Sequence, residues 1–220
     1  MKTLLKMVLA VVLLSGVASA QSAKVEMKMG EVKALQRATT LLAPTDYVGG
    51  WTTVMSGAIH TSSQKDLMFG VSIVTSLMTD TTVSSSRYTK DTSSAEAKIE
   101  VQVLVDGKVA APGPVTFDRR KQTLMAQFDG FACDIAADGT LSGCRYQDEV
   151  LQLILDTEAA HAFFFGAANV GVGDHTIEVQ ARTAVDGSSQ AGAWAASAFL
   201  GKGAFTVEEV RLVKDAVPTL

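Results

Sequence analysis

The stretch KIEVQVLV at residues 98–105 decides the fold class of this chain. Its apolar side chains Ile99, Val101, Val103 and Val105 alternate with charged or amide side chains over most of the stretch. This period of two is typical of a β-strand that covers a core with one face and meets water with the other. The stretch therefore predicts a half-buried strand in an antiparallel sheet.

Asp106-Gly107 follows this strand directly, and the apolar pattern resumes at residues 108–110. Asp-Gly tolerates the positive φ angles that a two-residue hairpin turn requires. We therefore expect a tight hairpin at this point. Pro112-Gly113-Pro114 then ends the returning strand.

A second alternating stretch runs over residues 175–185 and is again followed by Asp-Gly, at residues 186–187. By the same reasoning this dipeptide predicts a second hairpin. A turn this tight would set Val179 opposite Trp194 and place the tryptophan on the inner face of the sheet.

Further strands are expected from short apolar runs bounded by turn residues, at 52–60, 67–78, 123–128, 150–155 and 162–167. The run at 67–78 is apolar on both parities, which indicates a central strand that is covered on both faces. Residues 79–94 are mostly Ser and Thr and predict an exposed connection or a weak edge strand.

A change of phase at Glu208-Glu209 predicts a β-bulge in the last strand. Helical spacing permits a short helix at 31–42, and a helix is also possible at 150–155.

Composition and length agree with a single all-β domain. The chain has 220 residues, of which 47% are hydrophobic and 19% charged, and this excludes disordered, collagenous and coiled-coil proteins. Many short strands with frequent turn signals indicate a sandwich. We predict a single-domain antiparallel β-sandwich of jelly-roll type over residues 21–220.

The first 20 residues are typical of a secretory signal peptide. Lys2 and Lys6 precede an apolar run at 7–14, and Ala18-Ser19-Ala20 supplies the small residues of a cleavage site. The run is shorter than the roughly 20 apolar residues of a membrane-spanning helix. We therefore expect a cleaved, exported chain, secreted or periplasmic, without a stable membrane span; a retained anchor is the alternative.

The formal net charge of −4 argues against a nucleic-acid partner, because phosphate backbones are bound by clustered Lys and Arg. The one basic cluster, residues 119–121, is interpreted as solvated turn residues, with an anion site as the alternative.

The two cysteines lie nearly symmetrically about Asp138-Gly139. If these two residues form a turn, Ala137 pairs with Thr140, and counting outwards sets Cys133 opposite Cys144. Opposed strand positions are close enough for a disulfide, and an exported protein meets an oxidising compartment. We predict a structural Cys133–Cys144 disulfide, rather than a redox pair or a metal site.

No motif nominates a catalytic nucleophile, a cofactor or a metal centre. The three histidines, His60, His161 and His175, are far apart in sequence. Asp174 and His175 are the best candidates for an acid and a base, with a turn aspartate beside a surface histidine as the alternative. The acids at 129, 134 and 138 offer oxygen ligands for calcium as an alternative, but their spacing matches no EF-hand loop.

Two C-terminal segments, residues 173–182 and 205–212, resemble the late strands of secreted jelly rolls of the tumour-necrosis-factor-like type. The resemblance implies a sandwich of about ten strands, possible trimers, and a binding or scaffolding role without catalysis. It covers less than a third of the chain and assigns no functional residue.

These observations favour an exported, non-catalytic β-sandwich that binds a protein or a glycan, or that self-associates, at the cell surface or in the periplasm. The alternative is an extracytoplasmic hydrolase or lyase of polysaccharides that uses Asp174 and His175.

Overall fold

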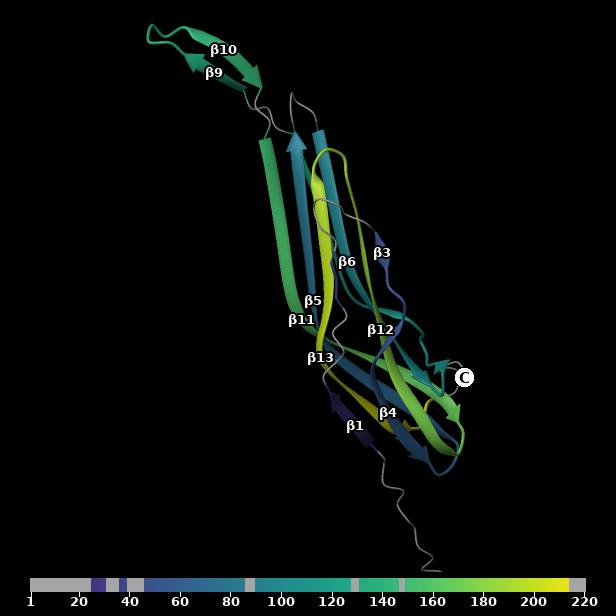
Figure 1. Ribbon diagram of the computed structural model, residues 1–220. Coiled ribbons are helices and arrows are strands. Elements are labelled where there is room, and N and C mark those ends of the chain that lie inside the picture. The colour runs from purple at the N-terminus through teal and green to yellow at the C-terminus, as the bar shows by residue number, and fades with distance from the viewer. Residues whose placement is uncertain are drawn as a thin grey trace, which may run out of the picture.

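The computed structural model describes residues 25–30, 36–38, 46–85, 90–127, 131–146 and 149–213. These residues form two antiparallel sheets that pack face to face, and a separate two-stranded hairpin (Figure 1). The predicted signal peptide and the last residues of the chain lie outside the described residues. None of the residues that the structure describes lies in a helix long and apolar enough to cross a membrane.

The first sheet has the strand order β1-β13-β5-β11, and β2 also pairs with β13. Its strands are β1 (Val25–Gly30), β2 (Gln36–Ala38), β5 (Lys65–Ser85), β11 (Glu149–Val170) and β13 (Ala193–Val210). β5 lies between β13 and β11, as the sequence predicted for a central strand. Its even-numbered side chains are nonetheless mostly only partly buried, because the second sheet covers one face of β5.

The second sheet has the order β3-β12-β6-β7, with β4 pairing to β12 and β8 to β6. Its strands are β3 (Tyr47–Val48), β4 (Thr52–Thr61), β6 (Lys90–Val105), β7 (Lys108–Val109), β8 (Val115–Gln127) and β12 (Gly173–Ser189). The all-β class and the sandwich predicted from the sequence are therefore correct. The finer assignment to a jelly roll stays a prediction.

The core lies between the two sheets and consists of alternate side chains of their central strands. Ile99, Val101 and Val103 on β6 are fully buried, and they face a layer from β5 and β13 that includes Phe69 and Phe205. The predicted period of two is the burial pattern of β6 as far as Val101. Beyond it Gln102 and Leu104 are buried as well, so the prediction that this face of the strand meets water is wrong there. This burial is the main source of stability, at roughly 25 cal/mol per Å² of apolar area.

The first Asp-Gly hairpin is present as predicted. Asp106 and Gly107 have φ angles of 50° and 79°, and Val105 pairs directly with Lys108. Positive φ at both positions is the geometry of the two-residue turns that match the twist of a β-hairpin.

The second predicted hairpin, at residues 186–187, is wrong. β12 continues through this dipeptide to Ser189, and Trp194 pairs with Thr81 of the other sheet instead of facing Val179. The glycine serves close packing: a Cβ atom at Gly187 would collide with the Trp194 ring and would lie 2.6 Å from the Ser94 carbonyl oxygen. A glycine within a strand marks a close approach of this kind. Trp194 is buried on the inner face, as predicted.

Two other sequence-based expectations are wrong. Residues 79–94 are not an exposed connection, because their described part forms the ends of β5 and β6, and Thr79, Thr81 and Ser93 are fully buried. The bulge of β13 lies between Leu200 and Gly203, while Glu208 and Glu209 stay in register with β5. Val210 also stays in register, opposite Asp66, so it shares the face of Glu208 and is only partly buried.

The two regions for which a helix was considered also form strands where they are described. The runs at 150–155 and 162–167 belong to one continuous strand, β11. Of residues 31–42 only Gln36–Ala38 is described, as strand β2. In both cases pairing with a neighbouring strand overrides the weak local helical spacing.

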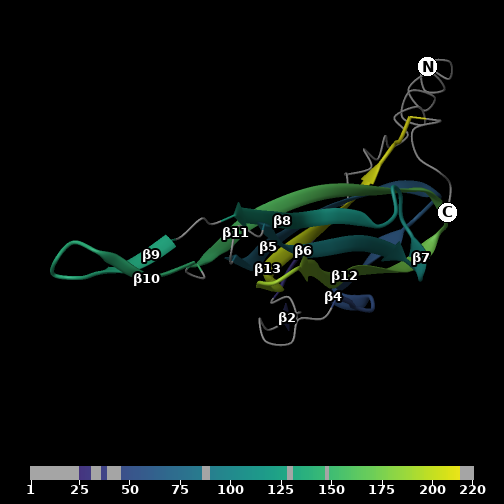
Figure 2. The same cartoon turned by 90° about the horizontal axis from the view of Figure 1, so that it is seen from above.

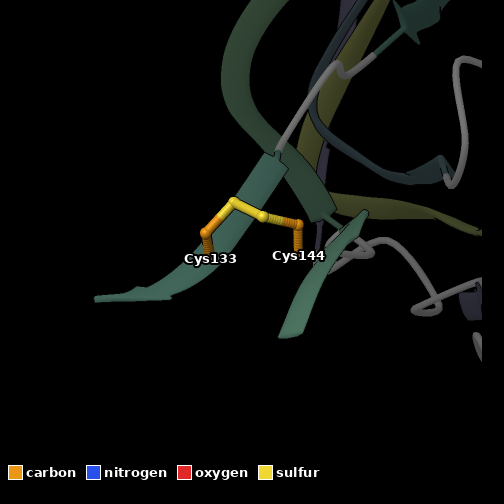
Figure 3. Close-up of a disulfide and its surroundings, with 2 residues drawn as sticks. All are labelled: Cys133 and Cys144. Carbon is orange, nitrogen blue, oxygen red and sulfur yellow. A yellow bond between two sulfur atoms is a disulfide. The ribbon is translucent and has the colours of Figure 1, made fainter. Parts of the chain in front are cut away.

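The predicted disulfide joins Cys133 and Cys144 across the hairpin β9 (Phe131–Ile135) and β10 (Leu141–Tyr146), as Figure 3 shows. Their Cα atoms are 4.0 Å apart. The turn is one residue wider than predicted, because Ala136 rather than Ala137 pairs with Thr140. A bulge that contains Gly143, at φ 59°, restores the register, so that the cysteines face each other.

Replacing both Cys133 and Cys144 by Ser is expected to loosen the hairpin and leave the sandwich intact. Closing a loop of this length contributes about 3 kcal/mol. Among the described strands, β9 and β10 pair only with each other, and the hairpin stands away from the two sheets (Figure 2). Hydrogen exchange should therefore accelerate at the amides of 131–146, while the melting temperature of the body stays constant. A large drop in the melting temperature would contradict the prediction that the disulfide stabilises only the hairpin.

Candidate functional site

His175 joins three segments at one end of the sandwich. Its Nδ1 donates to Asp106 Oδ2 at 2.7 Å, and its Nε2 lies 3.1 Å from both the Gly171 carbonyl oxygen and Thr61 Oγ1. Asp106 also accepts the backbone N–H of Thr176 at 2.8 Å. The imidazole is buried and both of its ring nitrogens are engaged within the protein.

This arrangement favours the charged imidazole. The hydrogen bond that His175 donates to Asp106 raises the pKa of His175 against the opposing effect of burial, and the Gly171 carbonyl acts in the same direction as Asp106. The pKa of Asp106 is lowered chiefly by the hydrogen bond from His175. A histidine whose two nitrogens are occupied in this way holds a turn and a loop together and offers no free nitrogen to a substrate.

Replacing Asp106 by Asn should lower the free energy of unfolding by about 1 kcal/mol below neutral pH, since a charged hydrogen bond with one half-exposed partner is lost. The raised pKa of His175 means that this stabilisation is complete below the ordinary histidine pKa of about 6.5. It is lost as the pH rises through the value in the folded protein.

Urea unfolding of the wild type and the Asp106→Asn variant, from about pH 5.5 to about pH 9, measures this effect. The difference between the two proteins should shrink as the pH rises. A difference that grows with pH would contradict a charged His175.

Asp174 does not act with His175, although the two are adjacent in sequence. Consecutive strand residues point to opposite faces, so Asp174 is 86% exposed while His175 is buried. The Asp174 carboxylate instead accepts a hydrogen bond at 2.7 Å from His60 Nδ1, its cross-strand partner on β4. The hypothesis that Asp174 and His175 form one acid–base pair is not supported by this geometry.

A second His–Asp contact links β11 to β8 at the side of the sandwich. His161 Nε2 lies 3.2 Å from Asp118 Oδ2, and the same oxygen accepts a hydrogen bond from Thr75 Oγ1 at 2.6 Å. The ring of His161 also stands edge-on to Phe117. The contact brings together residues that are 43 positions apart in sequence, and it joins the two sheets at their edge.

The basic cluster 119–121 lies in the middle of β8, not in a turn. Arg119 donates to both carboxylate oxygens of Glu96 at 2.8 Å, and Lys121 lies 3.8 Å from the same carboxylate. The hydrogen bond from Arg119 is the main cause of the lowered pKa of Glu96. These two cations therefore share one carboxylate across the strands of the outer face, which offsets part of their charge and weakens the case for an anion site.

A groove of about 320 Å³ lies on the outer face of the second sheet, beside β3. It is lined by Asp46, Tyr47, Val48, Glu96, Lys98, Ala184, Val185 and Asp186. An aromatic ring beside carboxylates is a surface on which a polar ring-shaped ligand can stack and form hydrogen bonds.

The distal half of β11 carries the largest run of exposed apolar side chains among the described strands. They are Val150, Leu151, Leu153, Ile154 and Leu155, between 40% and 66% exposed. β11 is the last described strand of its sheet, and none of the other described strands pairs with its outer backbone edge along this half. A long apolar edge strand of this kind is a template for pairing with another chain.

Three more apolar side chains are exposed on the neighbouring hairpin, namely Phe131, Ile135 and Leu141. The hairpin continues from the distal end of β11 and projects beyond both sheets (Figure 2). Phe164 on β11 is also exposed, while Phe165 is buried, as expected for an aromatic run that must point both ways.

The apolar run at residues 150–155 predicts a strand, with a helix as the alternative, and does not indicate that the strand lies at an edge. The signal that could have indicated an interface was an apolar run on both parities without Gly, Pro or charge. That pattern also fits a central strand, so only the pairing of β11 distinguishes the two.

No protein-family model matches the sequence, and no curated protein is similar to it. Solved structures with distant likeness include PNGF-II, which is 14% identical over 73% of this chain and 26% of that chain, with a TM-score of 0.22. The T13 IBDV viral particle is 11% identical over 91% of this chain and 42% of that chain, with a TM-score of 0.21. This chain thus spans about a quarter of the first protein and under half of the second.

Eiger TNF from S. frugiperda is 11% identical, with a TM-score of 0.21, and the match covers 90% of this chain and 99% of that chain. At such TM-scores none of the three likenesses carries an argument about function. The all-β class implied by the tumour-necrosis-factor-like resemblance is correct on the strand pairing alone, and the specific type stays a prediction.

Proposed function

We propose that this chain is an exported, non-catalytic β-sandwich that assembles with further copies of itself through the open distal edge of β11. The observation that carries the proposal is the exposed apolar run on this edge. Natural sheets protect their edges with charge, proline, bulges or a covering element. Residues 150–155 have no charge and no proline, and no strand in the described part of the chain pairs with their outer edge, so a second copy is the covering element that we propose.

Export is supported by two independent features. The first 20 residues have the composition of a signal peptide. The Cys133–Cys144 disulfide is of the kind that persists in oxidising compartments.

The enzymatic alternative has less support. Its two candidate residues point to opposite faces of β12, and His175 uses both ring nitrogens within the protein. Glycan binding, which the sequence also predicted, has one supporting observation, the groove beside Tyr47, and stays a prediction.

Size-exclusion chromatography with light scattering on residues 21–220 tests the proposal. The wild type is expected to have the mass of an oligomer, and the Leu153→Lys variant the mass of a monomer. Each interface of two copies would lose two buried leucines, so the dissociation constant should rise at least about a hundredfold.

Val172→Lys is the matched control, because Val172 is an exposed apolar residue just beyond the opposite end of β11. It should leave the oligomer intact. A wild type that stays monomeric at all concentrations would overturn the proposal, and a mass of three copies would favour the trimers implied by the tumour-necrosis-factor-like resemblance.

A further inference from the structure

We infer that two copies of this chain join their first sheets edge to edge, by antiparallel pairing of β11 with β11 about a two-fold axis at Leu153. This inference rests on the proposed function and specifies its geometry. The paired edges would make one continuous sheet, with the inner face of each copy on the same side.

The backbone of β11 determines which residues can bond across its free edge. Gly166 exchanges two hydrogen bonds of 2.9 Å with Ala111, which lies on the side of β11 away from β5. β11 pairs with β5 without a register shift from Glu149 to Ala167, so backbone direction alternates regularly over this range. The N–H and C=O groups of even-numbered residues therefore point to the free edge.

Gln152 and Ile154 are thus the residues whose backbone groups are available for pairing. Opposing Gln152 of one copy to Ile154 of the other makes two hydrogen bonds, and the symmetry makes two more. This register sets Leu153 directly opposite Leu153 of the second copy, as a pair without direct hydrogen bonds.

The side chains favour the same register. Leu151, Leu153 and Leu155 share the inner face of β11, since they pair with the buried side of β5. With the axis at Leu153, Leu151 of each copy faces Leu155 of the other, so all six leucines have leucine partners. A slip by two residues in either direction leaves Leu151 or Leu155 without one.

The occupant of this edge is therefore a second copy. A two-fold interface requires a surface that is complementary to itself, and three leucines at even spacing about a centre satisfy this requirement. On the outer face Asp156 meets Val150 and not another acid, so no like charges oppose within residues 150–156.

Symmetric disulfide crosslinking tests the axis. The two cysteines introduced by Leu153→Cys would have their Cα atoms about 4.5 Å apart, within the range of a disulfide. The Cα atoms of the two cysteines introduced by Leu151→Cys would be about 13 Å apart along the strands. Under mild oxidation Leu153→Cys should form a covalent dimer at least about tenfold faster than Leu151→Cys.

A mixture of the Leu151→Cys and Leu155→Cys proteins should form a disulfide-linked heterodimer. Peptide mapping identifies the new bond and checks that the Cys133–Cys144 disulfide is intact.

The outcomes separate this inference from the proposed function. A wild-type dimer in light scattering whose Leu153→Cys form crosslinks no faster than Leu151→Cys would overturn the axis and leave self-association in place. A monomeric wild type would overturn both. Rapid crosslinking of the Leu153→Cys protein with itself, and of the Leu151→Cys protein with the Leu155→Cys protein, supports the axis.

Discussion

Replacing Phe69 by Ala is expected to lower the free energy of unfolding by about 3–5 kcal/mol, the range for a fully buried aromatic side chain. Phe69 lies on β5 with no exposed surface, between Val207 of β13 and Phe165 of β11. Removing its ring leaves a cavity at the centre of the core, which rigid sheets fill only in part. Loss of this size is a large fraction of the stability of an ordinary domain.

Phe164→Ala is the matched control, because Phe164 lies on the neighbouring strand with its ring 64% exposed. Its cost should stay within about 0.5 kcal/mol, as for most surface substitutions. Urea unfolding, with the midpoint and slope measured for both variants, gives the comparison. Similar losses for the two variants would contradict the assignment of the core to one face of β5.

Replacing Gln122 by Ala is expected to cost about 2–4 kcal/mol, because buried groups would lose their hydrogen-bond partner. Gln122 extends from β8 to the other sheet, where its Oε1 accepts from Thr79 Oγ1 at 2.9 Å. Its Nε2 donates to Thr81 Oγ1 and, at 2.8 Å, to the Leu153 carbonyl oxygen. Both threonines are fully buried, so water cannot readily replace the lost partner.

Two further variants separate this network from a general effect of mutating β8. Thr123→Ala alters the exposed neighbour of Gln122 and should have little effect. Combining Gln122→Leu with Thr79→Val and Thr81→Val removes the polar groups together and should recover much of the loss, since apolar partners need no hydrogen bonds. If the triple variant is no more stable than Gln122→Ala, the penalty does not come from unsatisfied polar groups.

Local pattern was sufficient for several features of the fold. The alternation at residues 98–105 predicted the burial of Ile99, Val101, Val103 and Val105, because strand geometry sends neighbouring side chains to opposite faces whatever the partner, but it did not predict that Gln102 and Leu104 are buried too. Asp106-Gly107 predicted its turn, because positive φ is a property of those residues themselves. The Cys133–Cys144 pairing followed from near-symmetry about a turn, even though the turn was misplaced by one residue.

The candidate site was less accessible to such reasoning. The partner of His175 is Asp106, 69 positions away, and not the adjacent Asp174. The sequence neighbour lies on the wrong face, while the true partner comes from a turn that the sheet brings alongside. Proximity in sequence therefore selected the wrong carboxylate.

By itself the sequence determined several of the strands, one tight turn, the disulfide and the all-β class, because each of these depends on residues that are close along the chain. Only the tertiary structure decided that Asp186-Gly187 continues a strand, that Thr79 and Thr81 are buried, and that residues 150–155 form an open edge. These features depend on which strands lie side by side and which sheet covers them. Which strands become neighbours depends on the total apolar area that many side chains, distant in sequence, bury together, and no short stretch of sequence indicates that total.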